Sequence, residues 1–218
     1  MASLWTIQTY IQLNNLIMLL IRFLNTPLTI QGKELRNESY SIMSYDEEYL
    51  MQRYSPVITQ NGGDILNVGF GLGLIDGHIR NSNPTSHTII EIHPDAYQLA
   101  IDQGYENNVI LGDWRTVVPQ FIEQGKKFNS IFFDTYPLAD RPNEWEDFAD
   151  VVDSILKPGG IYSYFGAVEY PQIEEKMVNM GYTMQQIIIT FEELKTNVPD
   201  FRTSLVAKKD HKLVYFVK

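Results

Sequence analysis

Asp64-Ile-Leu-Asn-Val-Gly-Phe-Gly-Leu-Gly73 is the stretch of this 218-residue chain that decides its fold. The apolar run Ile65 to Val68 is typical of a strand buried in a parallel sheet. The three alternating glycines lack the side chains that would keep the backbone away from a ligand. Leu74 to Arg80 then has a helical pattern. This order predicts a cofactor site near residue 70, although an ordinary turn between a strand and a helix has the same pattern.

Strand and helix patterns alternate through the middle of the chain. The strand-like runs are Ile65–Val68, Thr88–Ile92, Asn108–Leu111, Ser130–Asp134 and Gly160–Phe165, and the helix-compatible segments are Ile75–Arg80, Ala96–Gln103, Thr116–Gln124 and Glu146–Leu156. Such alternation predicts an α/β fold with a mostly parallel, doubly wound sheet. Near the C-terminus, Gln185–Thr190 and Leu213–Val217 have no long helix between them, so we expect an antiparallel edge strand there.

The first part of the chain is expected to differ from the rest. Apolar residues recur at helical spacing from Leu4 to Leu24, but polar residues interrupt them too often for a membrane span. We therefore expect an amphipathic helix that packs on the domain or forms a homodimer, rather than a membrane anchor. A polar linker from Pro27 to Asn37 and a helix from Tyr40 to Thr59 would follow. The predicted division is an N-terminal helix and linker over residues 1–36 and a globular domain over residues 37–218.

The composition narrows the kind of partner. The chain has 17 Lys and Arg against 27 Asp and Glu, a net charge of −10, and no basic cluster that would bind nucleic acid. A cationic or zwitterionic small substrate fits this charge better. The absence of cysteine excludes disulfides and thiol catalysis and suits a cytoplasmic protein. The 4 histidines have no metal-ligand spacing, so we expect no metal site.

Polar residues at the carboxyl ends of the predicted strands are the candidate site residues, because open parallel sheets bind ligands there. Glu91 could accept both hydroxyls of a ribose, or be a solvated charge. Gly112-Asp113-Trp114 could hold and cover an adenine ring, or form a capped turn with the indole in the core. Asp134 ends the fourth strand, and Pro137 and Pro142 delay the next helix. That delay favours a catalytic carboxylate over a helix cap.

Several short matches carry a family resemblance. They are Leu66-x-Val68-Gly-Phe-Gly71, Ile89-Ile-Glu91, Gly112-x-Trp114, Phe133-Asp-Thr-Tyr-Pro-Leu138 and Leu156-Lys-Pro-Gly-Gly160. Through them the chain resembles class I S-adenosylmethionine-dependent methyltransferases. Within that class it resembles guanidinoacetate N-methyltransferase and the arginine N-methyltransferases that act on the inner guanidine nitrogen. The resemblance implies a Rossmann-like fold and S-adenosylmethionine as the cofactor.

The resemblance also implies roles for individual residues. Glu47 and Asp134 would be the catalytic pair that grips the guanidine. The implied cofactor-binding residues are Met43, Met51, Gly69, Phe70, Gly71, Leu72, Gly73, Glu91, Ile92, His93, Gly112, Asp113, Trp114 and Asp134, and the implied substrate-binding residues are Glu47, Asp134, Tyr136, Trp145 and Glu169. Two positions depart from the family, since Asp46 replaces a tryptophan and Asn67 replaces a glutamate.

The chemistry suits these residues. A guanidinium has a pKa above about 12, so it must lose a proton as one nitrogen attacks a methyl group. Carboxylates at Glu47 and Asp134 could bind the planar cation, orient it and accept that proton. We therefore expect methyl transfer to a guanidine nitrogen of a small molecule or of arginine. Asp46 motivates an alternative, a small amine or carboxylate acceptor, and a non-catalytic scaffold that associates through the first helix is a further alternative.

Overall fold

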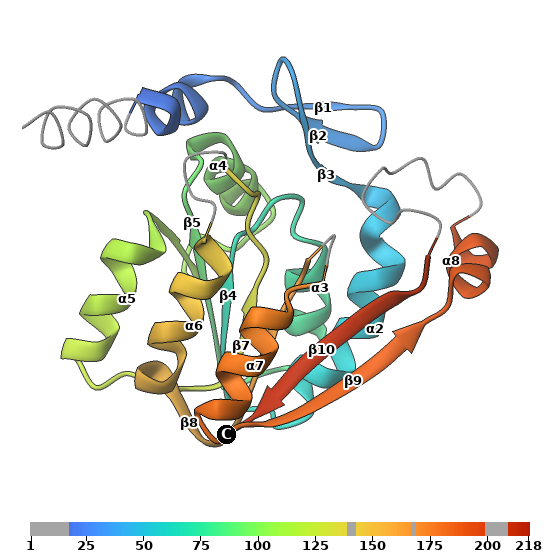
Figure 1. Ribbon diagram of the computed structural model, residues 1–218. Helices are drawn as coiled ribbons and strands as arrows, with labels where there is room; N and C mark the ends of the chain where they lie inside the picture. The colour runs from blue at the N-terminus through green and yellow to red at the C-terminus, as the bar shows by residue number, and fades with distance from the viewer. Residues whose placement is uncertain (1–17, 139–142, 167–168, 199–208) are drawn as a thin grey trace, which may run out of the picture.

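A 7-stranded sheet forms the centre of the protein, as Figure 1 shows. The computed structural model describes residues 18–138, 143–166, 169–198 and 209–218. The strands are β4 (Asp64–Val68), β5 (Ser86–Glu91), β6 (Val109–Leu111), β7 (Phe128–Phe133), β8 (Leu156–Tyr164), β9 (Thr183–Ile189) and β10 (His211–Val217). Their order is β6-β5-β4-β7-β8-β10-β9, and β4 to β8 are parallel. The chain reverses its direction of winding between β4 and β7, where such sheets bind ligands.

Helices cover both faces of this sheet, as the alternation predicted. One buried apolar cluster joins the sheet to α5 (Trp114–Glu123), α6 (Glu144–Ile155) and α7 (Pro171–Asn179). A second joins it to α2 (Glu48–Thr59), α3 (Leu74–Asn81) and α8 (Phe191–Asn197). A smaller cluster packs α4 (Pro94–Asp102) beside β5 and β6. The prediction of a doubly wound α/β fold is confirmed.

The C-terminal edge of the sheet is antiparallel, which confirms that prediction too. β10 lies between β8 and β9 and runs antiparallel to both. β9 is therefore the edge strand, and the last strand in sequence is an interior one. The helices α7 and α8, on either side of β9 in sequence, were not predicted. Both are short and strongly polar, so only a few buried side chains such as Ile173, Met177 and Leu194 hold them on the sheet.

A small antiparallel sheet precedes α2 and lies at the top of Figure 1. It consists of β1 (Thr29–Gln31), β2 (Glu34–Arg36) and β3 (Ser41–Ser44), in that order. The prediction of a polar linker over Pro27 to Asn37 was therefore wrong, because residues 29–36 form a hairpin. The predicted helix start at Tyr40 was also wrong. Pairing of strand β2 with β3 keeps the backbone in an extended conformation up to Ser44, and the helical conformation begins only after that residue.

A capping box marks this change from strand to helix. The Ser44 N–H donates to Glu47 Oε1 at 2.8 Å, and the Asp46 N–H donates to Ser44 Oγ at 3.2 Å. Between them the 3₁₀ turn η1 (Tyr45–Glu47) leads directly into α2. Such reciprocal bonds satisfy backbone donors that the first turn of a helix leaves open. The box therefore determines where Glu47 stands.

The segment before the small sheet is described only in part. Residues 18–25 are helical, and the rest of the predicted helix from Leu4 to Leu24 lies outside the described residues. In the part of the chain that is described, none of the helices combines the length and apolar character needed to span a membrane. A homodimer through the first helix remains a prediction. The predicted division after residue 36 passes between β2 and β3, which pair with each other.

Candidate functional site

A cavity of about 570 Å³ opens at the carboxyl ends of the parallel strands. The residues predicted for the site that line it are Met43, Glu47, Gly69, Phe70, Gly71, Glu91, Ile92, His93, Gly112, Trp114, Asp134, Tyr136 and Trp145. They come from β3, η1, the glycine turn after β4, the carboxyl ends of β5, β6 and β7, and the starts of α5 and α6. Its volume lies within the range of about 300 to 1,000 Å³ that is usual for small-molecule sites. The structure thus brings most of the predicted residues together.

The glycine turn is shaped by close approaches that only glycine permits. Gly69 has φ +96°, and a Cβ there would lie 1.9 Å from the backbone oxygen of Asp134. A Cβ on Gly71 would lie 2.5 Å from Met43 Sδ. The Leu72 N–H donates to that same sulfur at 3.2 Å. The turn is therefore held between the end of β7 and the methionine of the small sheet.

Glu91 is held at the end of β5 by backbone donors. Its Oε2 accepts from the Phe70 N–H at 2.7 Å, and its Oε1 accepts from the His93 N–H at 2.7 Å. Burial raises the pKa of this carboxyl, and the backbone donors oppose the rise. The alternative of a solvated charge is wrong, since Glu91 is only 6% exposed. Oε2 also accepts from the Gly71 N–H at 3.4 Å, so the acceptor capacity left for a ligand hydroxyl lies mainly at Oε1.

Glu47 and Asp134 line the cavity from elements far apart in sequence. Burial raises the pKa of the Glu47 carboxyl from its ordinary 4.5 to about 7, a rise that the Ser44 N–H opposes and the charge of Asp46 increases. Burial also raises the pKa of the Asp134 carboxyl well above its ordinary range, and the charges of Glu47, Asp76 and Glu91 add to the rise. Two coupled acids with raised pKa values in one cavity are typical of catalytic carboxylates.

Aromatic side chains line the same cavity as these acids. Trp145 stacks on Tyr170 with ring centroids 5.3 Å apart, and its indole N–H donates to the Phe165 carbonyl at 3.1 Å. Tyr136 stacks on Phe23 with centroids 6.0 Å apart. Aromatic faces attract cations, so these rings suit a cationic ligand.

Trp114 combines the two interpretations that the sequence left open. It packs edge-on against Phe133 and Phe148 in the core, and it also lines the cavity. Its indole N–H donates to Glu144 Oε1 at 3.0 Å. Asp113 caps α5 by accepting from the Arg115 N–H at 3.0 Å, and it is not among the lining residues.

Other predicted site residues also lie outside the described cavity wall. They are Met51, Leu72, Gly73 and Glu169. Met51 is 0% exposed and packs in the core around α2. This difference follows from the late start of α2. Met43 belongs to strand β3 and lines the cavity, whereas Met51 belongs to α2 and lies on the buried face of that helix. Glu169 is exposed.

Several residues of the cavity wall were not predicted from the sequence. Phe23 and Leu28 come from the N-terminal segment, Glu34 and Arg36 from β2, and Glu144 from the start of α6. The His93 Nδ1 accepts from the Asp95 N–H, so its Nε2 carries the proton and donates to the Phe23 and Thr26 carbonyls at 3.2 Å each. That contact places the N-terminal segment over the cavity. No periodicity in the sequence signals it.

Comparison of the sequence with known protein families identifies the family to which this chain belongs. The family model described as guanidinoacetate N-methyltransferase matches residues 26–208. The chain belongs to the guanidinoacetate N-methyltransferase family. The predicted resemblance is confirmed, and the match includes both β3 and the glycine turn.

Two relatives of this family member carry the name protein arginine N-methyltransferase 2. The one from Debaryomyces hansenii is 34% identical over 163 residues, which are 70% of this chain and 37% of the relative. The one from Aspergillus fumigatus is 24% identical over 185 residues, which are 80% of this chain and 43% of the relative. The chain thus spans less than half of the length of these relatives.

Two solved methyltransferase structures share this fold at low sequence identity. The Aeropyrum pernix fibrillarin with bound S-adenosyl-L-methionine has a TM-score of 0.55 at 13% identity, over 88% of this chain and 83% of that one. The O-methyltransferase from Bacillus cereus in complex with SAH has a TM-score of 0.54 at 12% identity, over 95% and 90%. These likenesses confirm the Rossmann-like methyltransferase fold, and the predicted cofactor agrees with the ligands in their titles.

Proposed function

We propose that this protein transfers the methyl group of S-adenosylmethionine to a guanidine nitrogen. The observation that carries the proposal is the pair of acids Glu47 and Asp134, which face one cavity and both have raised pKa values. S-adenosylmethionine supplies an electrophilic methyl group on a sulfonium sulfur when it is bound. The acceptor must then be a nucleophile that two carboxylates can hold and deprotonate.

The cavity has the groups that this cofactor requires. Glu91 would accept the ribose hydroxyls with the acceptor capacity that its backbone donors leave. Gly69 and Gly71 let the backbone of the turn approach the ligand, since neither could carry a Cβ without a clash. Trp114 and Gly112 would border the adenine. These residues fit the cofactor by their chemistry.

The charge of the cavity supports a cationic acceptor. Its acidic lining residues are Glu34, Glu47, Glu91, Asp134 and Glu144. Among the described lining residues, Arg36 alone is a lysine or arginine, and it forms an ion pair with Glu34. An acceptor with a free carboxylate would meet mainly like charges there, whereas a guanidinium would be stabilised.

Asp46 does not oppose this proposal. Its carboxylate forms an ion pair with Lys33 at 2.9 Å, and Asp46 is not among the lining residues of the cavity. It acts on the acceptor only through Glu47, whose pKa it raises. The replacement of the family tryptophan therefore adds no carboxylate to the acceptor space.

Glu47 and Asp134 would work in two steps. Their carboxylates would first bind the planar cation by charge-assisted hydrogen bonds and orient one nitrogen. Orientation of this kind can recover about 7 to 11 kcal/mol of a reaction barrier. One carboxylate would then accept the proton that the nitrogen loses. A raised carboxyl pKa suits that step, because general bases work best when their pKa lies near the operating pH.

The guanidine could be carried by a small molecule or by an arginine side chain. The family model names a small-molecule enzyme, and the named relatives support arginine in proteins. The decisive test incubates the protein with labelled S-adenosylmethionine and guanidinoacetate, arginine, arginine-containing peptides, small amines and carboxylic acids. Label on a guanidine compound supports the proposal. Label only on an amine or an acid refutes it, and absence of S-adenosylmethionine binding favours the scaffold alternative.

A further inference from the structure

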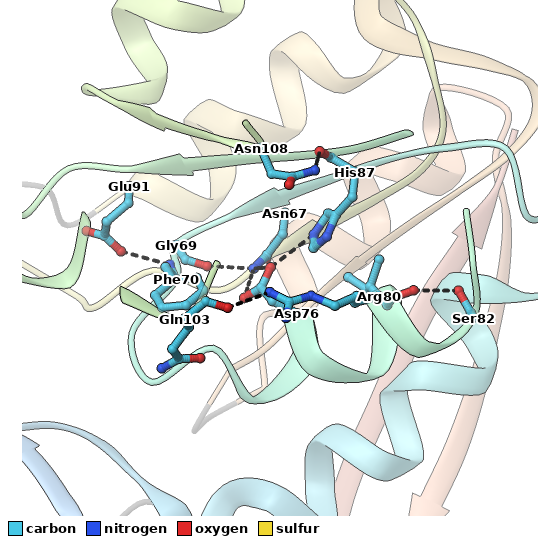
Figure 2. A network of polar contacts seen from close by, with 11 residues as sticks. Asn67, Gly69, Phe70, Asp76, Arg80, Ser82, His87, Glu91, Gln103 and Asn108 are labelled. Atoms are coloured by element: carbon cyan, nitrogen blue, oxygen red, sulfur yellow. Dashed lines mark hydrogen bonds and ion pairs between the residues drawn. The ribbon is translucent and has the colours of Figure 1, made fainter. Parts of the chain in front are cut away.

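A buried polar network lies beside the glycine turn, as Figure 2 shows. The Asn67 Nδ2 donates to Asp76 at 2.9 Å for Oδ1 and 3.0 Å for Oδ2, and to the Gly69 carbonyl at 2.7 Å. The His87 Nε2 lies 3.0 Å from Asp76 Oδ1. Asn67 and Asp76 are 0% exposed, and neither lines the cavity. The proposed reaction gives this network no direct contact with either substrate.

One peptide unit connects the network to the cofactor site. The carbonyl of Gly69 and the N–H of Phe70 belong to the same planar peptide, so they point in opposite directions. Asn67 holds the carbonyl on one side of the turn, and on the other side the Phe70 N–H donates to Glu91 Oε2 at 2.7 Å. The orientation of that peptide therefore determines whether Glu91 has its shortest donor at Oε2.

Asp76 determines which way the Asn67 amide faces. A carboxylate can only accept hydrogen bonds, and so can the Gly69 carbonyl. With the amide turned over, its oxygen would face both of these acceptors. In the observed orientation the amide places Nδ2 there, although Oδ1 then lacks a hydrogen-bond partner among the described residues. The His87 Nε2 lies beside this carboxylate, although it makes no hydrogen bond among the described residues.

We propose that Asp76 is a positioning residue for cofactor binding, which acts through Asn67 and the Gly69–Phe70 peptide on Glu91. The inference rests on the proposed cofactor site. It assigns Asp76 no contact with the cofactor and no part in proton transfer. Loss of the correct peptide orientation would leave Glu91 without its Phe70 donor, so that only the His93 N–H at 2.7 Å and the more distant Gly71 N–H would orient it toward the ribose.

A reciprocal exchange separates this role from simple packing. The double variant Asn67→Asp with Asp76→Asn keeps one amide and one buried carboxylate in contact, so the 67–76 hydrogen bond and the net charge are retained. It removes the donor to the Gly69 carbonyl, because the new side chain at position 67 only accepts. We expect the dissociation constant for S-adenosylhomocysteine, measured by calorimetry, to rise about 10- to 100-fold.

A coupling measurement tests the route through Glu91. In a Glu91→Ala background, the same exchange should change the dissociation constant less than about threefold, because effects that share one path are not additive. Asn67→Ser shortens the side chain and leaves Asp76 and His87 unchanged. This variant should raise the dissociation constant as the exchange does, and it replaces the double variant in the test if that variant does not fold. Ser163→Ala is the matched control, since it loses a buried hydrogen bond of 2.7 Å to the Val214 carbonyl away from the turn.

The outcomes are distinct. If the wild-type protein does not bind S-adenosylhomocysteine, the proposed function fails. If the wild-type protein binds it and the exchange and Asn67→Ser bind equally well, the positioning role of Asp76 is overturned and the proposed function stands. Full additivity with Glu91→Ala, or an equal loss in Ser163→Ala, would also overturn it.

Discussion

Replacing Glu47 with glutamine should stabilise the folded protein while it removes activity. Glu47 is 4% exposed, and burial is the main cause that raises its pKa from 4.5 to about 7. A carboxyl with a raised folded-state pKa favours folding when it is protonated. Its contribution is lost as the pH rises from the unfolded value of 4.5 through the folded value of about 7. Ionised Glu47 therefore destabilises the fold above neutral pH.

The structure also indicates the size of the effect. The difference between 4.5 and about 7 corresponds to roughly 3 kcal/mol at pH 8 and about 1 kcal/mol at pH 5. Glutamine keeps an oxygen that can accept from the Ser44 N–H, so the capping box survives the substitution. The variant should therefore gain stability by these amounts. For a domain of this size, 3 kcal/mol corresponds to a rise in Tm of roughly 6 to 12 °C.

The assay is urea unfolding of the wild-type protein and Glu47→Gln between pH 5 and pH 8, followed by circular dichroism. The advantage of the variant should widen as the pH rises, while its turnover of a guanidine substrate falls at least about 100-fold. Glu175→Gln, an exposed acid on α7, is the matched control and should change stability by less than about 0.5 kcal/mol at every pH. If the advantage did not grow with pH, or if the variant were less stable than wild type at pH 8, buried ionised Glu47 would not be destabilising and the prediction would be wrong.

Three further predictions concern the same cavity. Asp134→Asn should lower kcat about 10²- to 10⁴-fold and leave S-adenosylhomocysteine affinity within about threefold in calorimetry, because it removes a base but no contact of the ribose; unchanged kcat would exclude Asp134 as the base. Gly69→Ala should abolish S-adenosylhomocysteine binding, since its Cβ would lie 1.9 Å from a backbone oxygen, whereas Gly77→Ala in α3, with nothing within 4 Å, should bind normally. Phe23→Ala should weaken binding of the same ligand several-fold by removing the ring stacked on Tyr136, by about 0.5 to 1.5 kcal/mol; equal affinity would show that the N-terminal segment does not cover the site.

Local patterns predicted the main sheet well. The run Ile65 to Val68 and the glycines after it gave β4 and its turn to within a residue, and β5, β7 and β10 followed from similar apolar runs. A strand that is buried on both faces of a sheet has to be apolar on both, so its composition alone marks it. The small sheet had no such mark. Its strands β1 and β2 are 3 residues each and mostly polar, and they become strands only by pairing with each other and with β3.

The site divides in the same way. The sequence alone determined that Glu91, Gly112 and Asp134 would stand at one edge, because the carboxyl ends of parallel strands meet there. The family resemblance predicted that Glu47 joins them, and the tertiary structure shows that Glu47 lines the cavity and Met51 does not, since this depends on where β3 ends and α2 begins. The tertiary structure also determines the raised pKa values of Glu47 and Asp134, because a pKa depends on burial and on neighbours that are distant in sequence. The glycine turn at residue 69 depends on both sequence and tertiary structure. Its glycines predicted it, and in our proposal the tertiary contacts of Asn67 and Asp76 orient it.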